Sequence, residues 1–86
     1  MTLDELRTKI DSVDAEIATL FAERMELARQ VAETKRDTIP VLDSDREEQV
    51  RKQFLSRIPV EIKQYADSLL NTLLSVSKNY QNEVLK

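Results

Sequence analysis

The chain has 86 residues with 13 basic and 16 acidic side chains, and it contains no glycine, cysteine, histidine or tryptophan. This length suits one domain, residues 1–86, near the lower limit for a self-sufficient core. Without cysteine or histidine there is no disulfide framework, no common zinc or transition-metal ligand and no Ser-His or Cys-His nucleophile. We therefore expect neither a metal nor a cofactor.

Charge and hydropathy narrow the class of partner. A net charge of −3 argues against nucleic-acid binding, because no domain-wide positive field is available for phosphates. No apolar run approaches the roughly 18 residues of a membrane span, and residues 1–5 lack the basic-then-apolar form of a secretory signal. A cytoplasmic protein is the expectation. A chain without glycine also has few residues for positive-φ turns, which favours helices joined by short loops.

A long amphipathic helix is predicted from Leu3 to about Arg36. Thr2 and Glu5 form a capping-box pattern at its start. Apolar residues then recur at alternating steps of three and four, the spacing of one helix face: Leu3, Leu6, Ile10, Val13, Ile17, Leu20, Leu27 and Val31. Such a helix would be about 50 Å long, whereas a compact chain of this size has a radius of gyration of roughly 12 Å. Because the helix must overhang its own chain, we expect a second copy to cover it in an obligate helical dimer.

Arg24 occupies the position that should continue this apolar stripe. A guanidinium that faces the interior of a helical assembly is costly unless an anionic group meets it. That anion is either a carboxylate of the protein, in an interhelical salt bridge, or a carboxylate of a ligand. Lys35 lies on the same face, at steps of four, three and four through Ala28 and Val31. Lys35 would also complement the helix dipole and need have no other role.

Two further helices are predicted after a loop at residues 37–42. Ser44 and Glu47 form a second capping-box pattern, which opens a short helix that ends at about Arg57. Pro59 suits the first turn of a third helix that runs toward the C-terminus. The apolar positions of this helix include Ala66, Leu69, Leu70, Leu73, Leu74 and Val84. The predicted fold is all-α, with a long, a short and a long helix.

Polar residues interrupt the apolar faces of these two helices. One face of the short helix holds Asp43, Arg46, Glu47 and Val50, and Ser77 and Gln81 continue the apolar line of the third helix. Each has an ordinary structural interpretation as well. Asp43 would be an N-terminal helix residue, Arg46 and Glu47 would form surface pairs, Ser77 would be a small packing residue and Gln81 would be solvated.

Arg7 lies 17 residues before Arg24, roughly 25 Å along the helix. The two arginines cannot serve one site within one chain. In an antiparallel-type dimer, Arg7 of one chain would approach the central region of the other. Considered alone, Arg7 is an ordinary surface arginine.

Several stretches together resemble the all-α chorismate mutases (the AroQ class), which are intertwined dimers of three-helix chains. Residues 6–14, LRTKIDSVD, are similar to that family's opening "LR.KID.LD" pattern. Residues 22–28, AERMELA, are similar to "AERxELA", and residues 40–47, PVLDSDRE, correspond to "P(V/I)xDxxRE". Ser77 and Gln81 fall at the spacing of the family's Ser and Gln. The resemblance covers essentially the whole chain, and its specificity comes from several motifs in order.

The resemblance implies a site made from one chain and completed by Arg7 of the other. The residues carried over from the first chain are Arg24, Lys35, Asp43, Arg46, Glu47, Ser77 and Gln81. The implied reaction converts chorismate to prephenate by a concerted [3,3] rearrangement, which needs no nucleophile, metal or proton shuttle. The site must instead hold a dicarboxylate in a compact conformation and stabilise charge on the breaking ether oxygen.

The roles implied by the resemblance follow from the substrate's polar groups. Arg7 and Arg24 would clamp the two carboxylates, and which arginine takes which is left open. Lys35 and Gln81 would donate hydrogen bonds to the ether oxygen. Glu47, with the backbone near Asp43, would accept from the substrate hydroxyl. The remaining two residues, Ser77 and Arg46, would support the carboxylates.

Two alternatives remain beside the mutase. One is an isochorismate pyruvate lyase on the same scaffold, although lyase relatives generally lack the acidic hydroxyl-binding residue that Glu47 would supply. The other is a non-catalytic helical dimerisation or regulatory module, for which the salt-bridge interpretations would suffice. The sequence also leaves open a partner enzyme of the same pathway, and whether the chain is a free enzyme or a domain of a fusion.

Overall fold

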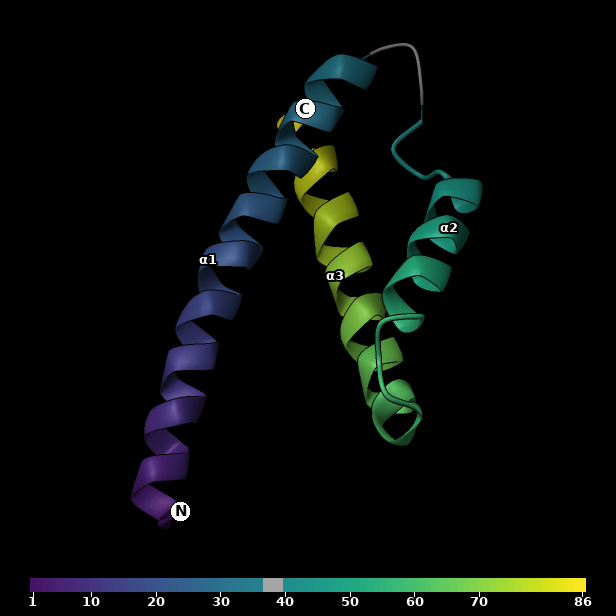
Figure 1. Ribbon diagram of the computed structural model, residues 1–86. Coiled ribbons are helices and arrows are strands. Elements are labelled where there is room, and N and C mark those ends of the chain that lie inside the picture. Colours follow the sequence, from purple (N-terminus) through teal and green to yellow (C-terminus); the bar gives the residue numbers. More distant parts are fainter. Residues whose placement is uncertain (37–39) are drawn as a thin grey trace.

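The computed structural model describes residues 1–36 and 40–86, which form three α-helices and one 3₁₀ turn. In chain order these are α1 (Leu3–Lys35), α2 (Ser44–Leu55), η1 (Val60–Ile62) and α3 (Lys63–Val84). Helices α1 and α3 converge toward their C-terminal ends and diverge toward the other end, and α2 lies beside α3 (Figure 1). The predicted all-α fold and the long, short, long order are confirmed. The predicted loop at residues 37–42 is described only from Pro40 onward, so its first half lies outside the described residues.

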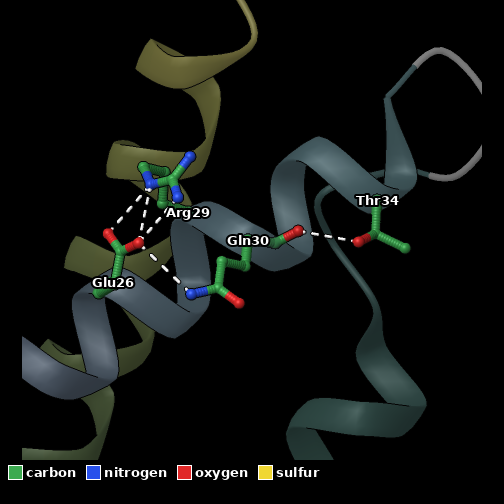
Figure 2. Close-up of polar contacts among 4 residues, drawn as sticks. All are labelled: Glu26, Arg29, Gln30 and Thr34. Atoms are coloured by element: carbon green, nitrogen blue, oxygen red, sulfur yellow. Dashed lines mark hydrogen bonds and ion pairs between the residues drawn. The ribbon is translucent and has the colours of Figure 1, made fainter.

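Helix α1 begins as the capping pattern predicts. The hydroxyl oxygen of Thr2 accepts from the Glu5 N–H at 3.1 Å, which satisfies one of the donors left open at a helix N-terminus. Farther along, Arg29 forms a forked hydrogen bond with Glu26, to which Gln30 also donates (Figure 2). These hydrogen bonds, chiefly the one from Arg29, lower the pKa of Glu26 below its ordinary value.

Helix α2 begins one residue earlier than the predicted capping box implies. Asp43 has an extended backbone, with φ −132° and ψ 94°, and its side chain accepts from the Arg46 N–H at 3.0 Å. Asp43 is therefore the N-cap and Ser44 is the first helical residue, so the prediction of a Ser44 cap was wrong. Both residue types cap well, and the chain uses the one whose backbone is still extended. The helix ends at Leu55, two residues before the predicted end.

A 3₁₀ turn replaces the predicted start of the third helix at Pro59. Pro59 has φ −57° and ψ 144°, and its carbonyl accepts from the Ile62 N–H at 3.1 Å. The short turn η1 follows, and α3 starts only at Lys63. The placement of Pro59 in the first turn of the helix was therefore wrong. Its fixed φ suits either position, and a 3₁₀ turn at a helix entry is common.

The core is small and lies between α1 and α3. Leu70, 1% exposed, is the largest fully buried side chain of the described residues, and Ala32 of α1 is fully buried. Buried alanines on α1 let the two helix backbones approach closely, since no larger side chain keeps them apart. Helix α2 is tied to α3 by Arg51, which hydrogen-bonds Asp67 and, at 2.6 Å, Asn71.

The N-terminal half of α1 extends away from the rest of the chain (Figure 1). The molecule measures 54 × 25 × 14 Å, with a radius of gyration of 15.9 Å, well above the roughly 12 Å of a compact chain of this length. Along this half the stripe residues are 44–61% exposed: Leu3, Leu6, Ile10, Val13, Ile17 and Leu20. The predicted overhang is confirmed, and its apolar face is uncovered within one chain. No helix in the described part of the chain is apolar enough over a sufficient length to cross a membrane.

Candidate functional site

One cavity of about 270 Å³ lies between the three helices, on the side where α1 and α3 converge. We call it the three-helix cavity. It is lined from α1 by Arg24, Leu27, Ala28, Val31 and Lys35, from α2 and the residues before it by Val41, Asp43, Arg46, Glu47 and Val50, and from α3 by Leu74, Ser77, Lys78 and Gln81. All seven site residues that were predicted from the same chain therefore line one cavity.

Arg7 is the predicted residue that does not line it. It lies in the exposed N-terminal half of α1, 17 residues before Arg24, which is roughly 25 Å along the helix axis. This placement agrees with the expectation that the two arginines cannot serve one site within a single chain.

The α1 wall of the cavity carries two half-buried cations, Arg24 and Lys35. No carboxylate among residues 1–36 and 40–86 forms an ion pair with Arg24. An arginine–carboxylate salt bridge within the chain, one of the two interpretations of Arg24, is therefore not found in the described part. Lys35 is the basic residue of the last helical turn. It also lines the cavity, and interaction with the helix dipole alone does not explain that position.

The α3 wall includes two buried polar side chains that are one helical turn apart. Ser77 is 7% exposed and Gln81 is 8% exposed. Gln81 donates from Nε2 to Ser77 Oγ at 3.1 Å, while its Oε1 is buried and has no hydrogen-bond partner among the described residues. The solvated interpretation of Gln81 is therefore wrong. Because buried polar atoms are nearly always paired, the unpaired Oε1 is an unused acceptor. Nε2 carries two hydrogens, so it retains one N–H donor after its bond to Ser77.

The polar residues of the α2 wall lie at the N-cap and in the first turn of the helix. Asp43 caps the helix, and Arg46 donates to Gln49 Oε1 at 2.6 Å within α2. Glu47 instead reaches across to α3, where Lys78 Nζ lies 3.0 Å from its Oε2. The surface-pair interpretation thus describes Arg46 but not Glu47, whose partner lies on another helix.

Lys78 is the polar residue of the cavity lining that was not predicted from the sequence. It follows Ser77 directly and lies four residues after Leu74 and three before Gln81, so helical spacing places it near the same face. That spacing was the available signal. A lysine next to a polar pair is ordinarily solvated, and its actual setting depends on how α2 packs against α3.

The charged side chains that line the cavity are four cations and two carboxylates. The cations are Arg24, Lys35, Arg46 and Lys78, and the carboxylates are Asp43 and Glu47. The formal excess is thus two positive charges, in a chain whose net charge is −3. A concave site with this excess attracts a compact dianion. Within residues 1–36 and 40–86, His, Cys, Asp and Glu side chains form no cluster of three that could hold a metal ion.

Comparison with known proteins agrees with this geometry. The family model described as "Chorismate mutase type II" matches residues 6–82. A protein of Methanocaldococcus jannaschii named "Chorismate mutase" is 47% identical over 49 residues, which cover 56% of this chain and 50% of that protein. The chain thus matches about half the length of this relative. No solved structure matches the chain significantly.

Proposed function

The chain belongs to the chorismate mutase type II family, and on that basis we propose that it rearranges chorismate to prephenate in the three-helix cavity. Chorismate is a cyclic dicarboxylate with a hydroxyl group and an ether bridge. The rearrangement breaks the C–O bond of the ether and forms a C–C bond within the same molecule. Because no atom enters or leaves, the protein needs only to hold the reactive conformation and stabilise developing charge.

The observation that carries the proposal is the convergence of three helices on one concave set of donors. Arg24 faces the cavity without a carboxylate partner in the described chain. Gln81 also lines it, and its Nε2 carries one hydrogen that the bond to Ser77 does not use. A volume of about 270 Å³ is close to the lower end of small-molecule sites, roughly 300 Å³. The cavity therefore suits one small ring compound with acidic groups.

Arg24 is proposed to bind one substrate carboxylate. Its planar guanidinium offers two parallel N–H donors, which match the two oxygens of a carboxylate. In the site, Ser77 and Arg46 support the carboxylates. Arg24 is half-buried. Water therefore screens an ion pair between Arg24 and a substrate carboxylate less than it screens an ion pair on the open surface.

Lys35 and Gln81 are proposed to stabilise the ether oxygen as its bond breaks. They lie on α1 and α3, and both line the cavity. An amide nitrogen carries two hydrogens, so Gln81 Nε2 retains one after its bond to Ser77. Two fixed donors aimed at a developing negative charge act without reorganisation, which is why such contacts stabilise a transition state strongly. A millionfold rate gain would require about 8 kcal/mol from these contacts and from conformational restriction together.

Glu47 is proposed to accept a hydrogen bond from the substrate hydroxyl, together with the backbone near Asp43. Its Oε2 faces Lys78, which leaves Oε1 as the acceptor. This acidic residue favours the mutase over the isochorismate pyruvate lyase alternative. The presence of a built polar cavity also disfavours the purely structural alternative.

A homodimer that supplies Arg7 is the second part of the proposal. The uncovered stripe on α1 is long and apolar, and such a surface is typical of an obligate interface. A second chain lying along it would bring its own Arg7 toward the cavity as the clamp for the other carboxylate. We also propose a cytoplasmic location, supported by the cysteine-free composition. A partner enzyme of the same pathway is a further proposal that rests on the family alone.

The test compares chorismate and isochorismate as substrates of the purified chain. We expect saturable conversion of chorismate to prephenate and much slower release of pyruvate from isochorismate. Faster elimination from isochorismate would replace the mutase assignment with the lyase. A folded chain that converts neither substrate would favour the non-catalytic module.

A further inference from the structure

Lys78 lies in the three-helix cavity, yet none of the roles assigned above uses it. It follows Ser77 on α3, and its ammonium lies 3.0 Å from Oε2 of Glu47 on α2. The pair is thus an ion pair between two walls of the cavity. It joins the proposed hydroxyl acceptor to the helix that carries Gln81.

The Glu47–Lys78 pair is more shielded than the ion pairs described within single helices. The side chains of Lys78 and Glu47 are 34% and 27% exposed. The side chains of the intrahelical pairs are 40% exposed or more, and Lys52 and Glu48 reach 77% and 60%. A shielded pair keeps a larger share of its Coulomb attraction and holds its side chains in fewer rotamers. Glu47 is therefore fixed from one side, by one of its two oxygens.

A glutamate in this position creates an electrostatic conflict. The site must accept a hydrogen bond from a hydroxyl, which suits a carboxylate, yet it must also attract a substrate with two negative charges. A carboxylate next to a dianion repels it, and the repulsion is stronger where water is excluded. Lys78 offsets that charge at 3.0 Å. With Lys78 the cavity has an excess of two positive charges, and without it the excess is one.

We propose that Lys78 is a positioning residue, which holds Glu47 by Oε2 so that Oε1 meets the substrate hydroxyl while the ammonium cancels the carboxylate's repulsion of the dianion. This inference rests on the proposed function. Lys78 acts through Glu47 and touches no reacting atom.

The test is a double-mutant cycle in chorismate turnover, with Lys78→Met, Glu47→Gln and the double variant. Lys78→Met keeps the length of the side chain and removes its charge. We expect Lys78→Met to lower kcat/KM roughly tenfold in the wild-type background, and far less when Glu47 is already Gln. The loss should lie mainly in KM, because the unpaired carboxylate weakens ground-state and transition-state binding of the dianion alike. Lys78→Arg should restore most of the activity.

Lys52→Met is the matched control, since it removes one positive charge from α2 outside the cavity, and we expect kcat/KM within about twofold of wild type. If Lys78→Met is poorly folded by circular dichroism, the cycle is repeated with Lys78→Gln. The inference would be overturned if Lys78→Met lowered kcat/KM equally in the wild type and in Glu47→Gln. It would also be overturned if Lys78→Arg did not restore the lost activity. If the wild-type chain turns over chorismate and Lys78→Met has the same kcat/KM, this inference alone is overturned. A wild-type chain without turnover would overturn the proposed function, and the inference with it.

Discussion

Gln81 donates from Nε2 to the hydroxyl oxygen of Ser77, 3.1 Å away and one turn earlier on α3. Both side chains are buried at the wall of the three-helix cavity. The hydrogen bond holds the amide against its own helix, which restricts the directions in which the second N–H can point. A serine that would otherwise only fill space thereby positions the amide.

Removal of either proposed donor to the ether oxygen should slow turnover severely. Because Gln81→Ala and Lys35→Ala each delete a contact that strengthens in the transition state, we expect kcat to fall by roughly 10²–10³. Steady-state kinetics on chorismate measures this. Asn79→Ala, an exposed change on the same helix, is the control and should keep near-wild-type turnover. Near-wild-type kcat in both Gln81→Ala and Lys35→Ala would contradict the ether assignment.

Arg24→Lys should behave as a damaging change although it keeps the charge. A lysine ammonium cannot form the two parallel bonds of a guanidinium, so we expect kcat/KM to fall by about tenfold or more. The control is Arg29→Lys on the same helix, where the arginine pairs with Glu26 outside the cavity. Equal kinetic effects of the two substitutions would contradict a forked contact at Arg24.

Arg7 provides a test of the shared site. In the proposed dimer each site combines Arg24 of one chain with Arg7 of the other, so Arg7→Ala and Arg24→Ala homodimers should both be nearly inactive. Co-expression of the two variants should restore about a quarter of wild-type activity, because half of the dimers are mixed and each mixed dimer has one intact site. Recovery no higher than the parent variants would contradict the exchange of Arg7.

The Glu26–Arg29 pair predicts a small pH dependence of stability. The pKa of Glu26 is lowered from 4.5, chiefly by the hydrogen bond from Arg29. A carboxyl group whose pKa is lower in the folded state than in the unfolded state stabilises the protein at pH values above its unfolded-state pKa. This stabilisation is lost as the pH falls through the folded-state pKa. Glu26→Gln should therefore lower the thermal midpoint slightly near neutral pH and leave it unchanged well below pH 4.5. Thermal denaturation of the wild type and of Glu26→Gln, near neutral pH and well below pH 4.5, measures this. A difference in thermal midpoint that is larger in acid than near neutral pH would contradict the prediction.

Much of the fold could be predicted from the sequence because one long helix makes up a large part of the chain. The spacing of apolar residues from Leu3 and the cap at Thr2 predicted α1 closely, since both signals are local. The start of α2 was not predicted correctly, because Asp43 and Ser44 are adjacent residues of equal capping ability and the backbone at Asp43 decides between them. The 3₁₀ turn after Pro59 was missed for a similar reason, since proline suits the entry of either kind of helix.

The sequence predicted which residues line the site, but it did not predict which of them form hydrogen bonds or ion pairs with one another. Arg24 stood out because it breaks an apolar stripe, and Gln81 because it continues one. Helical spacing cannot show that Glu47 reaches Lys78, because that contact depends on how α2 packs against α3. It also cannot show that Gln81 keeps an unpaired buried oxygen.

The most direct test of the central claim is the loss of chorismate ultraviolet absorbance on addition of the purified chain at neutral pH, with acid conversion of the product to phenylpyruvate as proof of identity. We expect saturable loss of chorismate that yields phenylpyruvate after acid treatment, and near-disappearance of this activity in Arg24→Ala. A folded chain that leaves chorismate unchanged, or an Arg24→Ala variant as active as wild type, would contradict the assignment of the three-helix cavity as a chorismate mutase site.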